Sequence, residues 1–292
     1  MNGLSRTICI YGVFVLGVLF PQMASLSFII QYAVMVMLFF SFLTMPITGN
    51  PIKPAHLWVL LANLALGFIP YFALKNVSQD YALIAFVTGI TPTAIAAPVI
   101  ISLIHKDVSF AATSVLITNL AIAFIIPFTL PHMVGASIEI NTTGIVIDVL
   151  TVMLIPFGLA FILRMGFPRA TSTVKRLNPL SFYIWIILIW IAVAKTTVYL
   201  KSQDEASFTQ LAVAASISFS LCIAGFLIGA LLGGKQFRRE ASQSLGQKNV
   251  MFSIWLSLSY LNPFIAMGPT FYILFHHMYN GWIILKYGDK KD

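Results

Sequence analysis

One lysine lies inside a long apolar run of the sequence. Lys248 belongs to the run 241–262, with Ser244 four positions before it and Gln247 and Asn249 on either side. If this run crosses a membrane, a charge at the bilayer centre costs about 3 kcal/mol even on lenient insertion scales. The ammonium should then face a bundle interior, a cavity or a partner group. The alternative is that the long side chain reaches out to an interface.

A second polar interruption divides an earlier apolar run. Gly89-Ile-Thr-Pro-Thr93 is followed by Pro98, and Gly246-Gln-Lys-Asn249 is the matching interruption later in the chain. Proline removes a backbone donor and frees a carbonyl. Unwound backbone at membrane depth is tolerated only where it is buried in protein or lines a cavity. Paired interruptions in two halves of a chain point to a binding site. The alternative is two ordinary kinks, since Gly and Pro are frequent in such helices.

Several other polar residues stand in apolar surroundings. His276 and Asn280 can share one helix face, and they suit either substrate contact or hydrogen bonding between helices. Adjacent residues such as His276 and His277 do not face each other, so this pair is poorly placed to chelate a metal. For Asn63, Thr118 and Asn119, hydrogen bonding between helices is the default. The candidate transport residues are Thr91, Thr93, Pro98, Asn119, Gln247, Lys248, Asn249, His276 and Asn280.

Acidic residues and catalytic motifs contribute little. The chain has nine Asp and Glu residues, and Asp148 is the one that lies well within an apolar run. It is a weak candidate partner for Lys248. Without an acid, we expect Lys248 to be stabilised by backbone carbonyls and helix C-terminal dipoles, or to lose its proton on burial. The sequence contains no H-E-x-x-H, G-x-S-x-G, Walker A or Asp-rich motif. We therefore expect neither an enzyme nor a metal site.

The composition indicates what must position these residues. Of 292 residues, 59% are hydrophobic and 9% are charged, and the mean hydropathy is +0.92. Soluble proteins are about 45–50% apolar and about 25% charged. This composition excludes a soluble enzyme, a nucleic-acid-binding domain and a disordered chain, and it indicates an all-α polytopic membrane protein. The net charge of +8 is explained by cytoplasmic loops, which collect Lys and Arg.

Ten apolar runs are long enough to be membrane spans. They are 7–21, 26–48, 57–75, 81–104, 108–131, 144–166, 178–200, 209–233, 241–262 and 264–287. With both termini cytoplasmic, thirteen of the seventeen Lys and Arg residues fall on the cytoplasmic side and three on the other, with Lys248 inside a span. A missed span would disturb this asymmetry.

An even number of spans suggests two five-helix repeats of opposite topology, at 1–135 and 136–292. Inverted repeats of this kind are common in transporters. The two interrupted spans are then the fourth and the ninth, which are corresponding spans of the two repeats. The whole chain, 1–292, is expected to form a single transmembrane unit.

The sequence around these interruptions resembles the bile acid:sodium symporter family, within the bile, arsenite and riboflavin transporter superfamily. The resemblance covers the chain in length and span count. It is sharpest in Gly89-Ile-Thr-Pro-Thr-Ala-Ile-Ala-Ala-Pro-Val99, the run on to Pro127, Ser244-Leu-Gly-Gln-Lys-Asn249, Asn262-Pro263 and His276-His277. It implies a panel of helices 1, 2, 6 and 7, and a core of helices 3–5 and 8–10 in which broken helices 4 and 9 cross. Members carry organic anions such as bile acids, steroid conjugates, pantoate and keto acids, usually with sodium.

The resemblance also shows where this chain departs from the family. The positions matching the family's sodium ligands hold Ala97, Pro98, Ala111, Val115, Ser244 and Lys248. Nearly all side-chain oxygens that would bind a hard cation are missing, and an ammonium stands at one sodium position. We hypothesise that Lys248 replaces a sodium ion, so that transport is independent of sodium, or coupled to protons if the lysine titrates. The alternative is that sodium still binds through backbone carbonyls.

The resulting prediction is a secondary active transporter of a small organic anion, working by alternating access. It has no cofactor, with Na⁺ or H⁺ left open as the coupling ion. Its expected partners are the anion and the lipid bilayer, its expected place a bacterial inner membrane. The alternatives are an efflux carrier of the related arsenite or auxin type, an intramembrane enzyme acting on a lipid-linked substrate, and a pore or receptor subunit.

Overall fold

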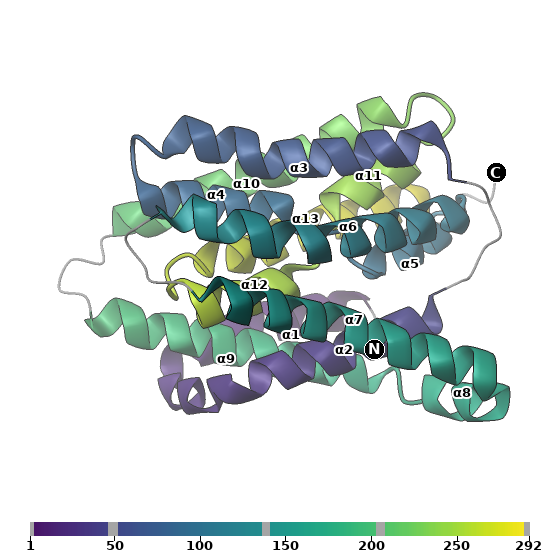
Figure 1. Ribbon diagram of the computed structural model, residues 1–292, viewed down its shortest axis with the longest axis horizontal. Coiled ribbons are helices and arrows are strands. Elements are labelled where there is room, and N and C mark those ends of the chain that lie inside the picture. Colours follow the sequence, from purple (N-terminus) through teal and green to yellow (C-terminus); the bar gives the residue numbers. More distant parts are fainter. Residues whose placement is uncertain (1–2, 46–51, 136–140, 203–207, 289–292) are drawn as a thin grey trace. The chain divides into compact units, whose positions relative to one another are not determined.

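A computed structural model describes residues 3–45, 52–135, 141–202 and 208–288. All regular elements in these ranges are helices, and no strand occurs among them. The elements are α1 (Gly3–Leu19), the 3₁₀ helix η1 (Pro21–Ile29), α2 (Ile30–Thr44), α3 (Pro54–Leu74), α4 (Gln79–Ile90), α5 (Ala96–Leu103), α6 (Val108–Val134), α7 (Thr142–Gly166), α8 (Pro168–Lys175), α9 (Leu180–Ser202), α10 (Phe208–Leu232), α11 (Arg238–Gly246), α12 (Val250–Tyr260) and α13 (Met267–Tyr287). Figure 1 shows them along the chain.

Within the described residues, six helical segments are long and apolar enough to cross a membrane, which indicates an integral multi-pass membrane protein. They are Pro21–Thr44, Pro54–Leu74, Val108–Val134, Thr143–Gly166, Leu180–Ser202 and Phe208–Leu232. The predicted fourth run, 81–104, is divided into α4 and α5, and the predicted ninth, 241–262, into α11 and α12. The start of the second run forms the 3₁₀ helix η1, and its end lies outside the described residues, as do Lys290 and Lys291 of the predicted cytoplasmic charges.

The chain forms two compact units. Unit 1 comprises Met1–Met45, Ala123–Ala206 and Ile254–Ala266, and unit 2 comprises Pro46–Ile122, Ser207–Ser253 and Met267–Asp292. In unit 1, α2 packs on α7 and α1 packs on α9. The rings of Phe42 and Phe157 meet edge to face at 5.3 Å in the first of these contacts. Helix α8, which we did not predict, is a short helix that packs against α2 and α7.

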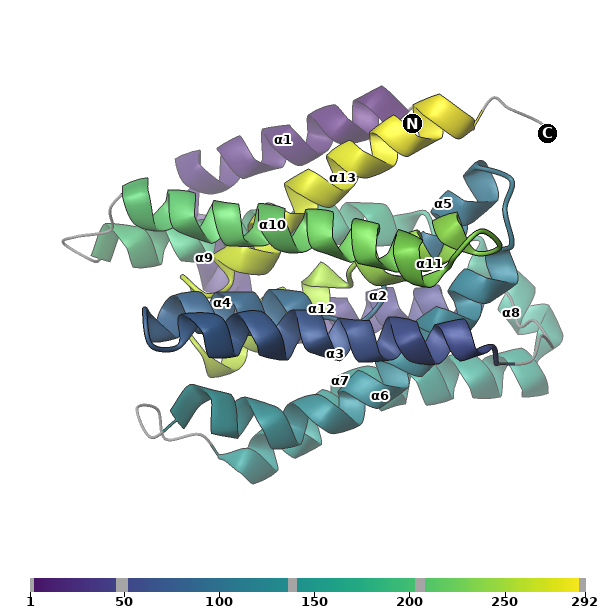
Figure 2. The ribbon, with the colours of Figure 1, turned by 90° about the horizontal axis from the view of Figure 1, so that it is seen from above.

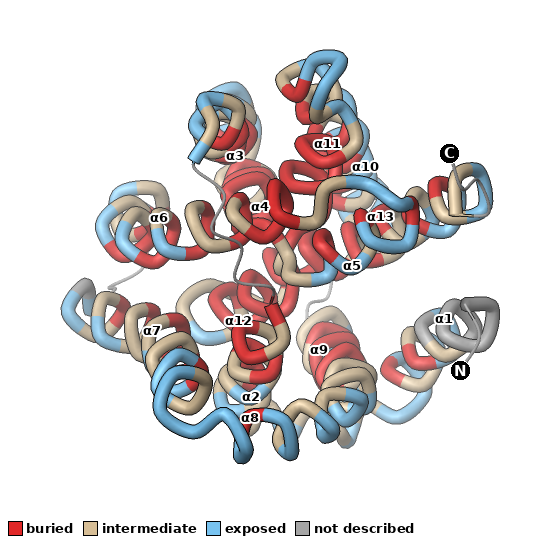
Figure 3. The backbone as a smooth tube through the Cα atoms, turned by 90° about the vertical axis from the view of Figure 1, so that its right-hand side faces the viewer, coloured by how far each residue is buried: buried red, intermediate tan, exposed pale blue. Residues whose placement is uncertain are grey.

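Unit 2 contains two helical hairpins, together with α5 and α13. Helix α3 lies beside α4, and α10 lies beside α11 (Figure 2). Helices α4 and α11 are almost wholly buried, as Figure 3 shows. Gly89 of α4 lies so close to α3 that a Cβ atom on it would overlap the carbonyl oxygen of Leu66. Small residues at helix contacts let backbones approach closely in membrane proteins, and this contact brings the end of α4 against α3.

Proline chemistry explains why α4 ends where it does. The Ser78 hydroxyl accepts a hydrogen bond from the Tyr81 backbone N–H at 3.4 Å and caps the start of the helix. At the other end, Thr91 is extended, with φ −46° and ψ 130°. The residue before a proline avoids the helical conformation, and Pro92 has no N–H to continue the ladder. Helix α5 resumes at Ala96, with Pro98 in its first turn, where a missing N–H costs no hydrogen bond.

Helix α11 ends without a proline. Gln247 follows Gly246 in an extended conformation, with φ −86° and ψ 102°. Gly246 lies against the ring of Phe226, and a Cβ atom there would overlap the ring. The segment Gln247–Asn249 then leads into α12. We call residues 91–95 the first break and residues 247–249 the second break.

Candidate functional site

The two breaks hydrogen-bond to each other within unit 2. The backbone N–H of Ala94 donates to Gln247 O at 2.8 Å, and the N–H of Asn249 donates to Pro92 O at 2.8 Å. Thr93 and Lys248 therefore face each other as an isolated antiparallel bridge. Backbone groups in a membrane must be satisfied within the protein. Each break supplies the partners that the other has lost from its helix.

Side chains cap the carbonyls at the end of α4 that have no partner within the helix. Lys248 Nζ donates to Gly89 O at 2.8 Å, and Asn63 Nδ2 from α3 donates to Ile90 O at 2.8 Å. The Thr91 hydroxyl donates to Val87 O at 2.6 Å. The last carbonyls of a helix lack partners within the helix and carry its negative partial charge. An ammonium at this position therefore interacts favourably with the dipole of α4.

The end of α11 is capped in the same way from the other side. The Thr93 hydroxyl of the first break donates to Ser244 O at 2.5 Å, and Tyr272 OH from α13 donates to Gly246 O at 2.7 Å. Thr93 thus caps α11 as Lys248 caps α4, so each member of the bridged pair serves the helix that leads into the other break. This reciprocal capping links the C-terminal ends of α4 and α11 through the two breaks.

Lys248 is buried and is held by neutral oxygens. Its side chain is 2% exposed, which contradicts the alternative of a lysine that reaches an interface. Besides Gly89 O, its ammonium donates to Asn63 Oδ1. An ammonium has three donors, and the third has no hydrogen-bond partner among the described residues. The expectation that backbone carbonyls and a helix C-terminus stabilise this lysine is confirmed.

Helix α6 holds the first break from a second direction. Thr118 Oγ1 accepts a hydrogen bond from the Thr93 N–H at 3.1 Å, and Asn119 Nδ2 donates to Thr93 O at 2.9 Å. The backbone N–H and the backbone carbonyl of Thr93 are therefore both bound by side chains of α6. Thr91 Oγ1 lies 2.5 Å from the hydroxyl of Ser253 in α12. The first break is therefore bonded to α6, to α12 and to the second break.

Helix α13 holds the second break through a chain of amides. Asn280 Nδ2 donates to Gln247 Oε1 at 2.7 Å, and Gln243 Nε2 of α11 donates to Asn280 Oδ1 at 3.2 Å. For Asn280, the structure therefore shows hydrogen bonding between helices. His276 is buried on the same helix, with its ring 5.6 Å from that of Tyr272. Its Nδ1 has no hydrogen-bond partner in the described part of the chain.

The positions that match the family's sodium ligands are apolar or already bonded. Ala97 and Pro98 are buried in α5, and Ala111 packs in an apolar cluster with Ile101 and Ile283. The Val115 carbonyl accepts a hydrogen bond from Asn119 Nδ2 at 2.8 Å. The Ser244 hydroxyl donates to Glu240 O at 2.8 Å within its own helix. Apart from Ser244, none of these side chains contains an oxygen that could bind a hard cation.

The structure adds partners that the sequence analysis did not assign to the site. Asn63, for which we expected ordinary hydrogen bonding between helices, is the side-chain partner of Lys248. Asp148, the weak acidic candidate, lies in unit 1 and accepts a hydrogen bond from Tyr260 OH. Tyr272 and Gln243 also bond to the second break or to its partners. A polar residue in an apolar run was the only sequence signal for Asn63 and Gln243.

The N-terminal ends of α3 and α11 are fastened by a separate polar cluster. Lys53 Nζ lies 3.8 Å from Asp107 Oδ2 and 4.0 Å from the centre of the Phe237 ring. The Asp107 N–H donates to Glu240 Oε1 at 3.2 Å. Burial raises the pKa of Asp107, but hydrogen bonds from Ser109 and the charge of Lys53 outweigh it and leave that pKa below its usual range. This cluster fixes the half-helix that leads to Lys248.

Comparison of the sequence with protein-family models gives no match, and comparison with curated proteins gives no match either.

Proposed function

We propose that this protein is a secondary active transporter of a small organic anion, related to the bile acid:sodium symporters and working by alternating access. The observation that carries the proposal is the pair of broken helices whose breaks bond to each other, with the ammonium of Lys248 buried where they meet. Irregular backbone at membrane depth is tolerated only where it is buried in protein or lines a cavity, and paired interruptions in the two halves of a chain point to a binding site. Charged residues inside membrane segments mark transport pathways.

The architecture of ten spans in two inverted repeats is part of this proposal. Two observations support it. Helices α4 and α5 replace one predicted span, and α11 and α12 replace another at the corresponding place in the second half. Unit 1 contains α1, α2, α7 and α9, and unit 2 contains α3, α4, α5, α10, α11 and α13, while α6 and α12 are divided. This division supports a panel and a core.

The site is suited to an anion because of its charge. Lys248 has no carboxylate within hydrogen-bond range among the described residues, so its positive charge is not neutralised by the protein. Helices α5 and α12 start at the breaks, and the positive dipole end of a helix attracts anions. Asn249 and Ala94 are partly exposed while Lys248 is buried. In the proposal, the substrate contacts these accessible positions, and the positive charge of the buried Lys248 attracts it. We call this ammonium the resident cation.

The resident cation takes the place of a bound sodium ion. The Lys248 ammonium donates to Asn63 Oδ1 and Gly89 O, and among the remaining family sodium positions Ser244 alone carries a side-chain oxygen. We therefore expect transport that does not need sodium. The substrate class is a carboxylate or sulfonate of bile-acid-like, steroid-conjugate, pantoate or keto-acid type.

Proteoliposome uptake tests the proposal. Labelled organic anions are first screened by thermal stabilisation of the purified protein, and the stabilising anions are then assayed for uptake. Wild-type uptake should be unchanged when choline replaces sodium. Lys248→Gln should reduce uptake by roughly tenfold or more, because removing a buried charge that attracts the anion is worth over 1.4 kcal/mol. Lys201→Gln, an exposed lysine of α9, is the matched control and should transport normally.

Two results would contradict the proposal. Wild-type transport that collapses in choline would show that sodium is still required. Lys248→Gln protein that remains folded and transports at the wild-type rate would show that the ammonium has no part in transport. Folding of the variant is checked by size-exclusion chromatography and thermal unfolding before uptake is compared.

A further inference from the structure

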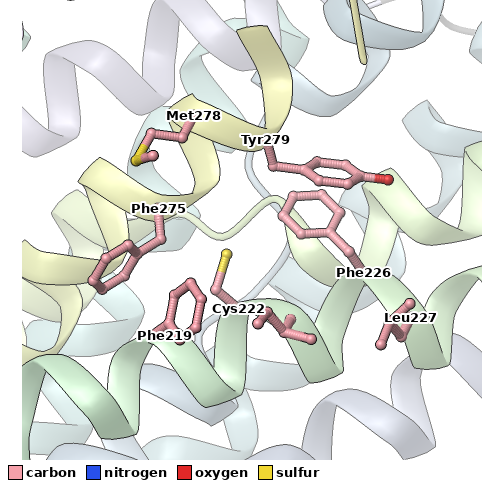
Figure 4. A pocket seen from close by; sticks show the side chains of 8 residues that line it. Phe219, Cys222, Phe226, Leu227, Phe275, Met278 and Tyr279 are labelled. Carbon is pink, nitrogen blue, oxygen red and sulfur yellow. The ribbon is translucent and has the colours of Figure 1, made fainter. Parts of the chain in front are cut away.

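A cavity of about 250 Å³ lies between α10 and α13 (Figure 4). Two aromatic pairs form its walls. The rings of Phe219 and Phe275 are 5.1 Å apart, and those of Phe226 and Tyr279 are stacked at 3.8 Å. The sulfur of Cys222 points into the space between the two pairs. The lining is almost entirely apolar, so the cavity suits a hydrocarbon group.

This cavity is an open groove on the surface of unit 2. Phe219 is 49% exposed and Met278 is 62% exposed, so its rim is accessible along both helices. The groove residues of α10 precede its end at Leu232 by five to thirteen positions, which corresponds to about 8–20 Å along a helix. One leaflet of the hydrocarbon core is about 15 Å deep. The groove therefore lies at the depth of the acyl chains of one leaflet.

A positively charged surface lies at the end of the groove. Arg239 lies over the ring of Tyr287 at 3.5 Å, and Lys286 Nζ lies 4.8 Å from the centre of the Trp282 ring. The Trp282 ring is 5.6 Å from that of Tyr279. Since Tyr279 also lines the groove, these contacts form one continuous surface from the apolar groove to the two basic side chains. Trp and Tyr are typical of the headgroup level of a membrane.

The basic side chains at this end have no acidic partner in the described ranges. The salt bridge found within the described ranges joins two other residues, Lys53 and Asp107. Glu240, the neighbour of Arg239, is buried and accepts a hydrogen bond from the Asp107 N–H. Arg239 and Lys286 are thus held against aromatic rings with their charges available to an anion at the membrane surface. Arg binds phosphate with particularly good geometry.

We propose that this surface is a binding site for one anionic phospholipid, with an acyl chain in the groove between α10 and α13 and the phosphate bound by Arg239 and Lys286. A free organic anion would satisfy the charges and leave the groove unused. A zwitterionic lipid would fill the groove but would gain less from two cations. The charge at one end and the apolar length below it match a single amphipathic molecule.

Native mass spectrometry of the detergent-purified protein tests this site. The protein is incubated with equal amounts of phosphatidylglycerol and phosphatidylcholine that carry the same acyl chains. Each basic residue beside an anionic headgroup is expected to contribute about fivefold in affinity. Wild-type protein should therefore retain phosphatidylglycerol preferentially, and the double variant Arg239→Gln, Lys286→Gln should lose most of that preference. Ile223→Trp, which places a large ring at the partly exposed wall of the groove, should reduce retention of both lipids.

The matched control is the double variant Arg169→Gln, Arg176→Gln. It removes the same charge from exposed residues of unit 1 and should keep the wild-type preference. Equal losses in the two double variants would show only general attraction to basic surfaces and would overturn the proposal. Unchanged lipid retention in folded Ile223→Trp protein would refute the binding of an acyl chain in the groove. Displacement of the lipid by millimolar glycerol phosphate would assign the charges to a free anion instead.

Discussion

At the scale of the residue, the protein has buried an ammonium without a carboxylate. Lys248 is bound by a side-chain amide and a helix carbonyl. A charge of this kind is costly to bury, and its neutral partners repay the cost only while all of them are in place. Asn63 serves two purposes at once, because its oxygen accepts from Lys248 and its nitrogen donates to Ile90 O. Its loss leaves a cation and a carbonyl unsatisfied together.

We expect Asn63→Leu to destabilise the protein by about 3–5 kcal/mol, the effect typical of removing one partner of a buried charge. The double variant Asn63→Leu, Lys248→Met should recover part of this loss, because it removes the uncompensated ammonium and leaves only the Gly89 and Ile90 carbonyls without their side-chain donors. Thermal and denaturant unfolding in detergent measure the effect. Asn76→Leu, an exposed position in the turn after α3, is the control and should change stability by no more than about 0.5 kcal/mol. Additive losses in the double variant would exclude the coupling.

The sequence predicted that Lys248 is enclosed by the protein, but not that Asn63 is its partner. A lysine in an apolar run is visible because its burial is costly wherever it lies. Asn63 is 185 residues away, and nothing in its own run distinguishes it from Thr118 or Asn119. Its role depends on α3 lying against the end of α4, and that contact is made by Gly89. Pairings of this kind follow from the packed fold and are not written in local sequence.

At the scale of the element, two helices are interrupted, and a residue of each break caps the helix that leads into the other break. The first break could be predicted because Pro92 leaves a clear chemical cause. The second lacks a proline, and its prediction rested on polar residues alone. The reciprocal capping by Thr93 and Lys248 could not be predicted, because it needs the two breaks side by side. The short helices η1 and α8 were also missed, since each is too short to show a periodic apolar pattern.

Gly89→Ala tests the close contact that brings α4 against α3. A Cβ atom at this position would overlap Leu66 O, so the two backbones must separate. This moves Gly89 O away from Lys248. We expect a loss of several kcal/mol in stability, as is typical for strain in a packed core, with reduced uptake.

The control for Gly89→Ala is Gly158→Ala in α7. A Cβ atom there meets no neighbouring atom within 4 Å. Alanine has a higher helix propensity than glycine by roughly 1 kcal/mol, so this variant should be as stable as wild type or more so. Thermal unfolding compares the two proteins. Equal stability of Gly89→Ala and wild type would mean that α3 and α4 are not held at this distance.

At the scale of the whole molecule, the distribution of basic residues predicts an orientation in the membrane. The α7–α8–α9 region carries Arg164, Arg169, Lys175 and Arg176, whereas the turn between α3 and α4 carries a single cation, Lys75. Cytoplasmic loops are the ones that collect Lys and Arg. The predicted topology therefore places α8 in the cytoplasm and the turn after α3 on the opposite side.

Single-cysteine labelling in a Cys9→Ser, Cys222→Ser background tests this orientation. Ser172→Cys in α8 and Val77→Cys in the turn after α3 are both exposed positions. A membrane-impermeant maleimide should label position 77 in intact cells and position 172 only in inverted vesicles. The opposite pattern would reverse the topology, and labelling of both positions from one side would refute the predicted number of spans between them.

The resident ammonium has an electrical consequence for a carrier of the proposed kind. With a protonated Lys248 and no carboxylate bound to it, the empty site bears one positive charge, and a monovalent anion makes the loaded site neutral. A membrane potential acts on an elementary charge with about 2.3 kcal/mol per 100 mV. The voltage-sensitive step is then the return of the empty carrier, and loaded movement in either direction is electrically silent.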